Sequence, residues 1–466
     1  MTATALDGAI QHAGEERSND VRRIAASSEP SCLRTYTPSL AVIAKSAGCW
    51  HWTLDGRKLM DFTSGVLVAN LGHNPTRWWQ RVQRYMGWPA LDAATGEEFT
   101  AAVPLTTYNA VTPLEAQASQ RLAALMRAQP GGSRCEQVMW AASGSEAVHK
   151  ALVTAMAQRP GANIVLATRR GFHGKKGLAA AVTGDEHSPD RDPRVKFISF
   201  PTEECVDVAA RRESLDLAAY ERELQAQWEA YGSSICALIT EPYLGGGGSF
   251  HPQKEYLQLL ERFCREHDVL FILDEVQANF GRTGSLFAFS EYGVEPDMVV
   301  LGKGLGNGIA VSAVVGRADV FARLNFGDGS DTWSGNPLAS ASVLATLDEF
   351  ESGDVLAHAR RLGALLEKHL LKLQAEVPAI ARVRGEALVW GLECAPLDGR
   401  TAAETAETLV KSCYLGDEEG RAIHLLGPLS GKVVRVSPPL TTPLAAAEEY
   451  LAVLHERAAN LSRSFG

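Results

Sequence analysis

The sequence predicts an α/β fold with a mostly parallel central sheet covered by helices. Short, almost continuously apolar runs alternate with longer helical patterns between about residues 100 and 335. Such runs are typical of strands buried on both faces, and parallel strands need helices as crossovers. The predicted strands are residues 163–167, 195–200, 235–240, 270–273 and 298–301. In sheets of this kind ligands bind at the carboxyl ends of the strands.

Helical periodicity separates these strands. The two clearest apolar sets at helical spacing are Leu257, Leu259, Leu260 and Phe263, and Ala147, Val148, Ala151, Leu152 and Ala155. The last 120 or so residues combine predicted helices at 341–350, 355–376 and 444–459 with short strands at 388–393 and 432–436. That mixture indicates a second, α+β domain.

The N-terminal residues follow a different pattern. Residues 1–35 are polar and unperiodic, so we expect an arm that is loose unless it folds against something else. From Gly48, apolar and polar residues alternate on both sides of Asp55-Gly56, which predicts a β-hairpin with a type I′ turn. The expected division is an N-terminal arm (1–35), the N-terminal part of a small domain (36–95), a large domain (96–340) and the C-terminal part of the small domain (341–466).

Composition narrows the function classes. The 466 residues carry a formal net charge of −10 with no basic run, so nucleic-acid binding is not expected. The eight cysteines form no C-x-x-C pair and indicate neither a metal site nor a disulfide framework. Because no signal-peptide pattern and no run of eighteen apolar residues is present, we expect a cytoplasmic protein without a membrane partner.

Two predicted strands end in side chains that can carry chemistry. Residues 269–273 lead into Asp274, and residues 298–301 lead through Gly302 into Lys303. The acid and the lysine can form a simple buried salt bridge, since a buried carboxylate needs a partner. They can also hold a cofactor, with the lysine as a Schiff base and the acid as partner of a protonated pyridine nitrogen. The two residues alone do not decide between these readings.

Two further segments offer contacts for such a cofactor. Gly144 and Ser145 run directly into a helical pattern, which is either an ordinary Ser-capped helix or a phosphate cup built from amides, a hydroxyl and the helix dipole. Phe172 lies between glycines, at Arg-Gly-Phe-His-Gly (170–174). It is either a core residue or an aromatic that lies flat against a ring.

The order and spacing of these segments resemble the class III aminotransferases, of the ornithine/4-aminobutyrate (omega) type, among the fold type I pyridoxal-phosphate enzymes. The motifs are Ser-Gly-Ser-Glu-Ala (143–147), Phe-His-Gly (172–174), Glu-Pro (241–242), Asp-Glu-Val-Gln (274–277), Gly-Arg-Thr-Gly (281–284), Gly-Lys (302–303) and Thr-Trp-Ser-Gly-Asn-Pro (332–337). Asp55-Gly56, Asn-Leu-Gly-His (70–73) and Arg435 also match, so the likeness covers roughly residues 40 to 460. It implies a large domain with a mostly parallel sheet and a smaller α+β domain built from both chain ends.

The resemblance implies a pyridoxal 5'-phosphate-dependent aminotransferase, which moves an amino group from an amine or amino acid to a 2-oxo acid through a pyridoxamine phosphate intermediate. Lys303 would be the catalytic lysine, which forms the aldimine and carries the proton, and Asp274 the pyridinium partner. Gln277 would bond the phenolic oxygen of the cofactor. Thr332 would bind the phosphate from the opposite subunit of a homodimer, with a tetramer as the larger assembly, while His73 is interpreted as structural.

The same resemblance supplies the rest of the cofactor site. Gly144 and Ser145 would form the phosphate cup, and Phe172 would stack on the ring. His173 and Glu241 belong to the cofactor-binding motifs of the family.

The substrate is indicated only on the acceptor side. Many family members carry Glu-Pro-x-x-Gly-Glu-Gly-Gly, whose second glutamate pairs with the arginine that Arg435 matches, but here Gly246 stands in its place. Arg435 would then be available to a substrate carboxylate, which fits a 2-oxo acid. The alternative is a strand arginine with another partner. Trp50, Trp52, Tyr243 and Trp333 are candidates for lining an apolar pocket or for plain packing, so the donor stays open.

Other functions share this cofactor apparatus. A racemase, decarboxylase or aminomutase of the same family differs from a transaminase in which bond lies perpendicular to the ring. A non-catalytic regulatory protein that binds the cofactor is a more distant alternative, because Lys303, Asp274 and Gln277 are all present.

Overall fold

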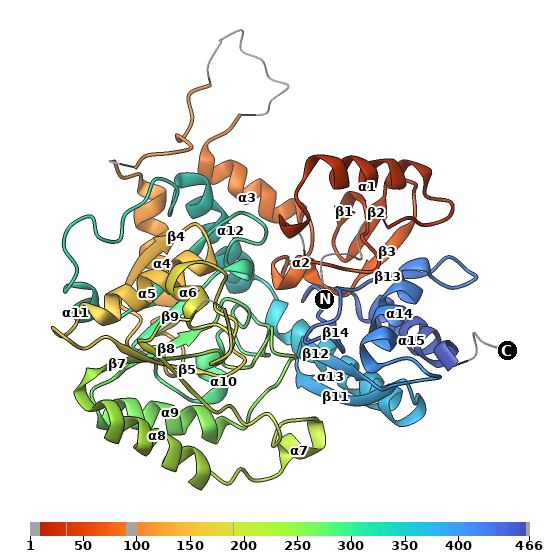
Figure 1. Ribbon diagram of the computed structural model, residues 1–466. Coiled ribbons are helices and arrows are strands. Elements are labelled where there is room, and N and C mark those ends of the chain that lie inside the picture. The colour runs from red at the N-terminus through yellow and green to blue at the C-terminus, as the bar shows by residue number, and fades with distance from the viewer. Residues whose placement is uncertain (1–9, 34, 90–99, 109, 190, 463–466) are drawn as a thin grey trace. The chain divides into compact units, whose positions relative to one another are not determined.

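The computed structural model describes residues 10–462 except residues 34, 90–99, 109 and 190 (Figure 1). The chain divides into two compact units. The larger unit comprises residues 68–70 and 75–359, and the smaller one comprises the described residues up to Leu67, residues 71–74 and residues from Arg360 onward. The boundaries expected at residues 95 and 340 both fall inside the larger unit. One reason is that Arg121, inside the expected large domain, donates to the Tyr85 hydroxyl at 3.2 Å and pairs with Asp348 at 2.9 Å, so it contacts residues beyond both expected boundaries.

A seven-stranded sheet forms the centre of the larger unit, in the order β4-β10-β9-β8-β7-β5-β6. The strands are β4 (Gln137–Ala141), β5 (Ile164–Thr168), β6 (Val195–Ile198), β7 (Ile235–Thr240), β8 (Leu270–Asp274), β9 (Met298–Leu301) and β10 (Ser312–Gly316). β10 is antiparallel to β4 and β9, and the other pairs are parallel. The predicted mostly parallel sheet is confirmed, and β4 and β10 are additions to the five predicted strands.

Helices cover the strands of the larger unit. They are α3 (Thr76–Met86), α4 (Pro113–Arg127), α5 (Gly144–Met156), α6 (Gly177–Ala181), α7 (Val208–Arg212), α8 (Ala218–Tyr231), α9 (Lys254–Glu266), α10 (Ala288–Tyr292), α11 (Ala318–Phe321) and α12 (Pro337–Ser352). The small apolar side of α5, with Val148 and Ala151 fully buried, packs in one core with Ile239, Ile272 and Val300 of the sheet. α8 and α9 lie side by side (Figure 1).

Two smaller sheets belong to the smaller unit. Its strands are β1 (Ile43–Ala47), β2 (Trp50–Thr53), β3 (Lys58–Asp61) and β13 (Ala422–His424) in one sheet, and β11 (Ile380–Glu386), β12 (Val389–Cys394) and β14 (Val433–Val436) in the other. Its helices are α1 (Glu16–Ser28), α14 (Ala402–Leu415) and α15 (Leu444–Ala459), and the chain enters it along α13 (Val355–Glu376). β13 pairs with β3 in parallel, so this sheet joins segments from both ends of the chain.

The hairpin at Asp55-Gly56 is confirmed, but its predicted type I′ turn is wrong. β2 and β3 pair antiparallel, and the loop between them holds residues 54–57. Only Gly56 among the four has a positive φ, of 91°, whereas a type I′ turn needs positive φ at both central residues. The Gly56 amide donates to the Thr53 carbonyl at 3.0 Å, so residues 53–56 form the hydrogen-bonded turn and Gly56 is its last residue.

The arm expected over residues 1–35 contains an ordered helix in its described part. α1 follows Glu15, which is 1% exposed and receives a hydrogen bond from Arg22 Nη2 at 2.7 Å. The Asp55 carboxylate of the hairpin loop accepts the amides of Arg17 and Ser18, so a residue outside the helix satisfies two of its first free N–H groups. The helix is stabilised by these distant partners, which is why its own polar sequence did not predict it.

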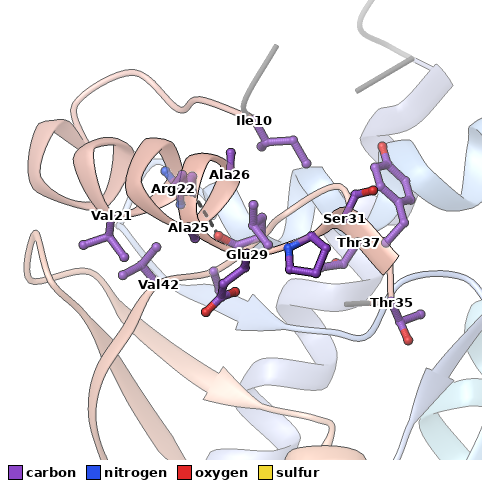
Figure 2. Close-up of a pocket in the computed structure, with 14 residues that line it drawn as sticks. Ile10, Val21, Arg22, Ala25, Ala26, Glu29, Ser31, Thr35, Thr37 and Val42 are labelled. Atoms are coloured by element: carbon purple, nitrogen blue, oxygen red, sulfur yellow. Dashed lines mark hydrogen bonds between the residues drawn. The ribbon is translucent and has the colours of Figure 1, made fainter. Parts of the chain in front are cut away.

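Beside α1 lies a hollow of about 380 Å³ (Figure 2). Val21 and Ala25 of the helix line it together with Thr37 and Val42 of the following segment.

None of the described helices combines the length and the apolar character that a membrane span requires.

Candidate functional site

The predicted site residues of the larger unit lie at the carboxyl ends of its parallel strands. Asp274 is the last residue of β8, and Lys303 follows the neighbouring strand β9 by two residues. Asp274 pairs with Val300 across these strands, so the acid and the lysine segment leave the sheet at the same edge. This is the edge at which ligands of such sheets bind.

The carboxylate of Asp274 is 4% exposed and held in one orientation. His173 Nδ1 lies 2.7 Å from Asp274 Oδ2, and the Val276 amide donates to Oδ1 at 3.0 Å. An ionised carboxylate only accepts hydrogen bonds, so His173 donates from Nδ1. Its Nε2 is buried and has no partner among the described residues. These two hydrogen bonds leave other lone pairs of the Asp274 carboxylate available to a further donor.

Lys303 is half-buried, has a left-handed φ of 47°, and starts a short 3₁₀ turn (Lys303–Leu305). The preceding Gly302 packs closely, because a Cβ there would lie 2.7 Å from Ser312 Oγ. Asn279 Nδ2 donates to the Gly302 carbonyl at 3.1 Å and to the Glu275 carbonyl at 2.6 Å. The segment that carries the lysine is therefore tied to the segment that carries Asp274.

The N-terminus of α5 lies against the same edge. Ser143 caps the helix by accepting the Glu146 amide, and Gly144 packs on Val276, since a Cβ there would lie 3.2 Å from it. Gly144 and Ser145 are the first residues of the helix, so their amides have no acceptor within it. Gly174 contacts Ser145 closely, and the Lys175 amide donates to Ser145 Oγ at 3.4 Å. The capped helix is confirmed, while the phosphate cup at Gly144 and Ser145 stays a prediction.

Phe172 lies in the loop after β5 and is 37% exposed. Glu241 holds this loop, because its Oε1 accepts the Phe172 amide at 2.9 Å while Oε2 accepts the Gly245 amide at 3.2 Å. Burial, with a smaller contribution from the charge of Asp274, raises the pKa of Glu241 to about 7. Both Glu241 oxygens serve backbone amides, so this residue positions Phe172.

Gly246 packs directly against Phe172. A Cβ on Gly246 would lie 2.9 Å from Cβ of Phe172. A larger residue at position 246 would therefore have to displace Phe172, which gives a local reason for a glycine at this position.

Gln277 is 9% exposed and its side-chain amide packs on Gly245. Tyr243 is buried, stacks on His251 at a ring distance of 4.3 Å, and donates from its hydroxyl to the Gln277 carbonyl at 3.0 Å. Tyr243 thus has the packing role that was the alternative to lining a pocket.

Thr332 is exposed, in the segment before α12, and Trp333 beside it is 66% exposed. Lys150 of α5 anchors the segment, since its Nζ lies 2.6 Å from Asp331 and 2.8 Å from the Trp140 carbonyl. Three residues hold the site segments in place without a predicted role. Val276 lies inside the Asp-Glu-Val-Gln motif, whereas Asn279 and Lys150 belong to no motif. Among these residues, only Lys150 has a local pattern that indicates an interaction, its i,i+4 spacing from Glu146 on a helix.

Arg435 and the tryptophans Trp50 and Trp52 belong to the smaller unit. Arg435 lies in β14, is 2% exposed, and pairs across the sheet with Gly391. Its part in substrate binding stays a prediction.

Most of the chain matches a known family. The family model described as Aminotransferase class-III matches residues 32–457. The chain belongs to the class-III aminotransferases. A leucine/methionine racemase of Thermococcus litoralis is 29% identical to it over 92% of each chain, and a 4-aminobutyrate aminotransferase of Mycobacterium bovis is 30% identical over 86% of each. The solved structure of an amine transaminase from an uncultivated Pseudomonas species, in its PLP-bound form, is 26% identical, with a TM-score of 0.76 over 94% of this chain and 97% of that one.

The cofactor of this class-III aminotransferase is pyridoxal 5'-phosphate. Residues at the strand ends can bind both charged groups of the cofactor, the pyridinium ring and the phosphate. The oriented Asp274 carboxylate can accept a pyridinium N–H, and the amides of Gly144 and Ser145 at a helix N-terminus can bind a phosphate.

Proposed function

We propose that the protein transfers an amino group from an amine or amino acid to a 2-oxo acid, with Lys303 and Asp274 as catalytic residues. One observation carries this proposal. The buried carboxylate of Asp274, which His173 orients, lies at the end of β8, and the neighbouring strand β9 leads to Lys303. A carboxylate fixed in this way favours a positive charge opposite it. A lysine next to it can accept and return a proton.

Pyridoxal phosphate supplies an aldehyde that bonds to amines and a ring that delocalises the electrons of a carbanion when its nitrogen is cationic. We assign the maintenance of that cation to Asp274 and the proton transfer at carbon to Lys303. Gln277 is assigned to the phenolic oxygen and Phe172 to the ring face, where stacking contributes on the order of 1 kcal/mol.

The phosphate is assigned to Gly144 and Ser145. Helix N-termini bind dianions because their free amides and the helix dipole act together. His173 and Glu241 are assigned as positioning residues, since the first holds Asp274 and the second holds the Phe172 loop.

On the substrate side, we assign Arg435 to the carboxylate of the 2-oxo acid. A guanidinium matches a carboxylate with two parallel hydrogen bonds.

The proposal includes a homodimer, with Thr332 of one subunit at the phosphate of the other. The exposure of Thr332 and Trp333 supports it, since both are free to meet a second chain. We also propose a cytoplasmic location. The described chain has no disulfide, and seven of its eight cysteines are buried thiols, which suits a reducing compartment.

A racemase is the second candidate, because one relative carries that name at 29% identity. A panel of amines and amino acids, added to the cofactor-loaded enzyme and followed by visible absorbance, separates the two. Amino transfer predicts loss of the visible band with a donor alone and its return on adding a 2-oxo acid. Loss of optical activity of an amino acid without any acceptor would instead establish the racemase, and no spectral response to any amine would contradict both.

A further inference from the structure

Three side chains of the smaller unit converge away from the cofactor residues. His51 of β2, Asp61 of β3 and His73 each offer one ligand atom, and these atoms all lie within 4.8 Å of one another. Asp61 Oδ2 is 2.8 Å from His73 Nε2 and 3.6 Å from His51 Nε2. Ligands of a tetrahedral zinc ion with bonds of about 2.1 Å stand about 3.3 Å apart, which these separations bracket.

The three ligand atoms are oriented by further hydrogen bonds. Ser46 Oγ lies 2.6 Å from Nδ1 of His51, so that Nδ1 can donate and leave the lone pair on Nε2. Asp61 Oδ1 accepts the amide and hydroxyl of Thr63, each at 2.7 Å, which leaves Oδ2 toward the histidines. Metal ligands in proteins are typically held in this way by a second layer of partners.

Burial and charge suit a cation at this cluster. The side chain of Asp61 is fully buried and that of His51 is 7% exposed, while His73 at 18% leaves a path from solvent. The carboxylate of Asp61 thus faces two imidazole nitrogens within 3.6 Å in a largely buried position.

A third imidazole lies near the cluster. The ring of His424 is 5.3 Å from that of His51, and its Nδ1 is buried without a partner among the described residues. His424 is not one of the three residues whose ligand atoms lie within 4.8 Å of one another.

We propose that His51, Asp61 and His73 form a binding site for a divalent transition-metal ion, with Zn²⁺ as the reference ion. Two imidazoles and one carboxylate are a ligand set that zinc accepts, and the fourth position falls to water. The ion links the β2–β3 hairpin to residue 73, so binding stabilises the smaller unit. The cysteine spacing gave no sign of this site because none of its ligands is a cysteine.

The test uses the untagged, cofactor-loaded full chain carrying Cys32→Ser, which removes the exposed thiol. After treatment with a chelator and desalting, it is titrated with Zn²⁺ by calorimetry and with Co²⁺ by difference absorbance. We expect one ion per chain, a Co²⁺ spectrum of low coordination, and a higher Tm with Zn²⁺. His51→Gln should weaken binding on the order of 100-fold and Ser46→Ala about tenfold, as losses of a ligand and of its partner.

His187→Gln, at an exposed histidine elsewhere, is the matched control and should bind as the parent does. The cofactor band and circular dichroism report the fold of each variant. If the parent chain takes up no Zn²⁺ or Co²⁺, or if His51→Gln and Ser46→Ala both bind as tightly as the parent, the three side chains form only a hydrogen-bonded cluster and the proposal is overturned. The amino-transfer proposal is unaffected by either result, since it is tested by the spectral response to amines.

Discussion

Single side chains in this protein have properties that depend on partners far away in the sequence. Asp274 and His173 are 101 residues apart and form one buried pair at 2.7 Å. Glu241 is buried, and its carboxylate serves two backbone amides of different loops. The chemistry of the site at the residue scale therefore rests on which groups the fold brings within hydrogen-bonding distance.

Asp274→Asn is expected to lower turnover by roughly two to three orders of magnitude while the enzyme keeps its cofactor. The neutral amide leaves the cofactor nitrogen without its ionic partner, and breaking a buried ion pair costs roughly 3–5 kcal/mol. Single-turnover kinetics with a reactive amine measure the effect. His173→Gln keeps the charge of Asp274 and removes only its orienting bond, so it should lower turnover less. Near-normal turnover of Asp274→Asn would contradict the role assigned to Asp274.

Lys303→Ala is expected to bind pyridoxal phosphate without showing the visible band of a lysine-bound cofactor, because the covalent link needs an amine. Absorbance after desalting checks this. Lys176→Ala, at an exposed lysine of the loop before α6, serves as the control and should keep the band. Persistence of the band in Lys303→Ala would assign the Schiff base to another lysine.

Glu241 is expected to make the cofactor-free enzyme less stable as the pH rises from 4.5 toward 7. Its pKa is raised to about 7 in the folded chain, from 4.5, so the folded state binds a proton that the unfolded state has released. The stability from this group is complete below pH 4.5 and lost through pH 7, by about 3 kcal/mol. Urea denaturation across this range measures it, and a Glu241→Gln chain with the same pH slope would rule out this residue as the source.

Elements of the chain differ in how well their own residues predict them. The ranges of β7, β9, α13 and α15 were predicted to the residue, because long periodic patterns and continuous apolar runs carry their signal locally. β10 was not predicted, since its five residues follow a glycine-rich turn and its strand status depends on pairing with β4 and β9.

The helix α1 shows the same dependence more strongly. Its mostly polar residues form a helix because Arg22, buried within it, pairs with Glu15, which also receives hydrogen bonds from Arg57 and Tyr414. Partners nearly 400 positions away in the sequence cannot be read from a local pattern.

Arg22→Met is expected to lower the free energy of unfolding by roughly 3–5 kcal/mol, because it removes the closest ionic partner of the buried Glu15. Thermal unfolding followed by circular dichroism measures the change. Arg23→Met removes an exposed arginine one position along the same helix and should cost about 0–1 kcal/mol. Equal effects of the two substitutions would show that the buried pair contributes nothing beyond a surface charge.

At the scale of the whole molecule, the proposed site is complete only when a second chain supplies Thr332. The cofactor residues Lys303 and Asp274 come from one chain, and closed twofold dimers are the most common assembly of soluble proteins.

Mixing Lys303→Ala and Thr332→Glu chains, by unfolding and refolding together, is expected to restore roughly a quarter of wild-type activity, because half of the dimers formed are hybrids with one intact site of two. Each variant alone should be inactive, the second because a carboxylate repels the phosphate. Sedimentation confirms the dimer. No recovery in a mixture that does form hybrids would mean that Thr332 acts within its own chain or not at all.

The sequence by itself determined the fold class, the cofactor and the order of the residues that are proposed to bind it. Strand ends, glycines and caps are local patterns, and their succession along the chain is enough to identify the family. The tertiary structure alone decided that His173 orients Asp274, that Glu241 and Gly246 shape the Phe172 loop, and that His51, Asp61 and His73 meet. The physical reason is that a hydrogen bond or ion pair between distant residues depends on the packing of whole elements, which no local pattern encodes.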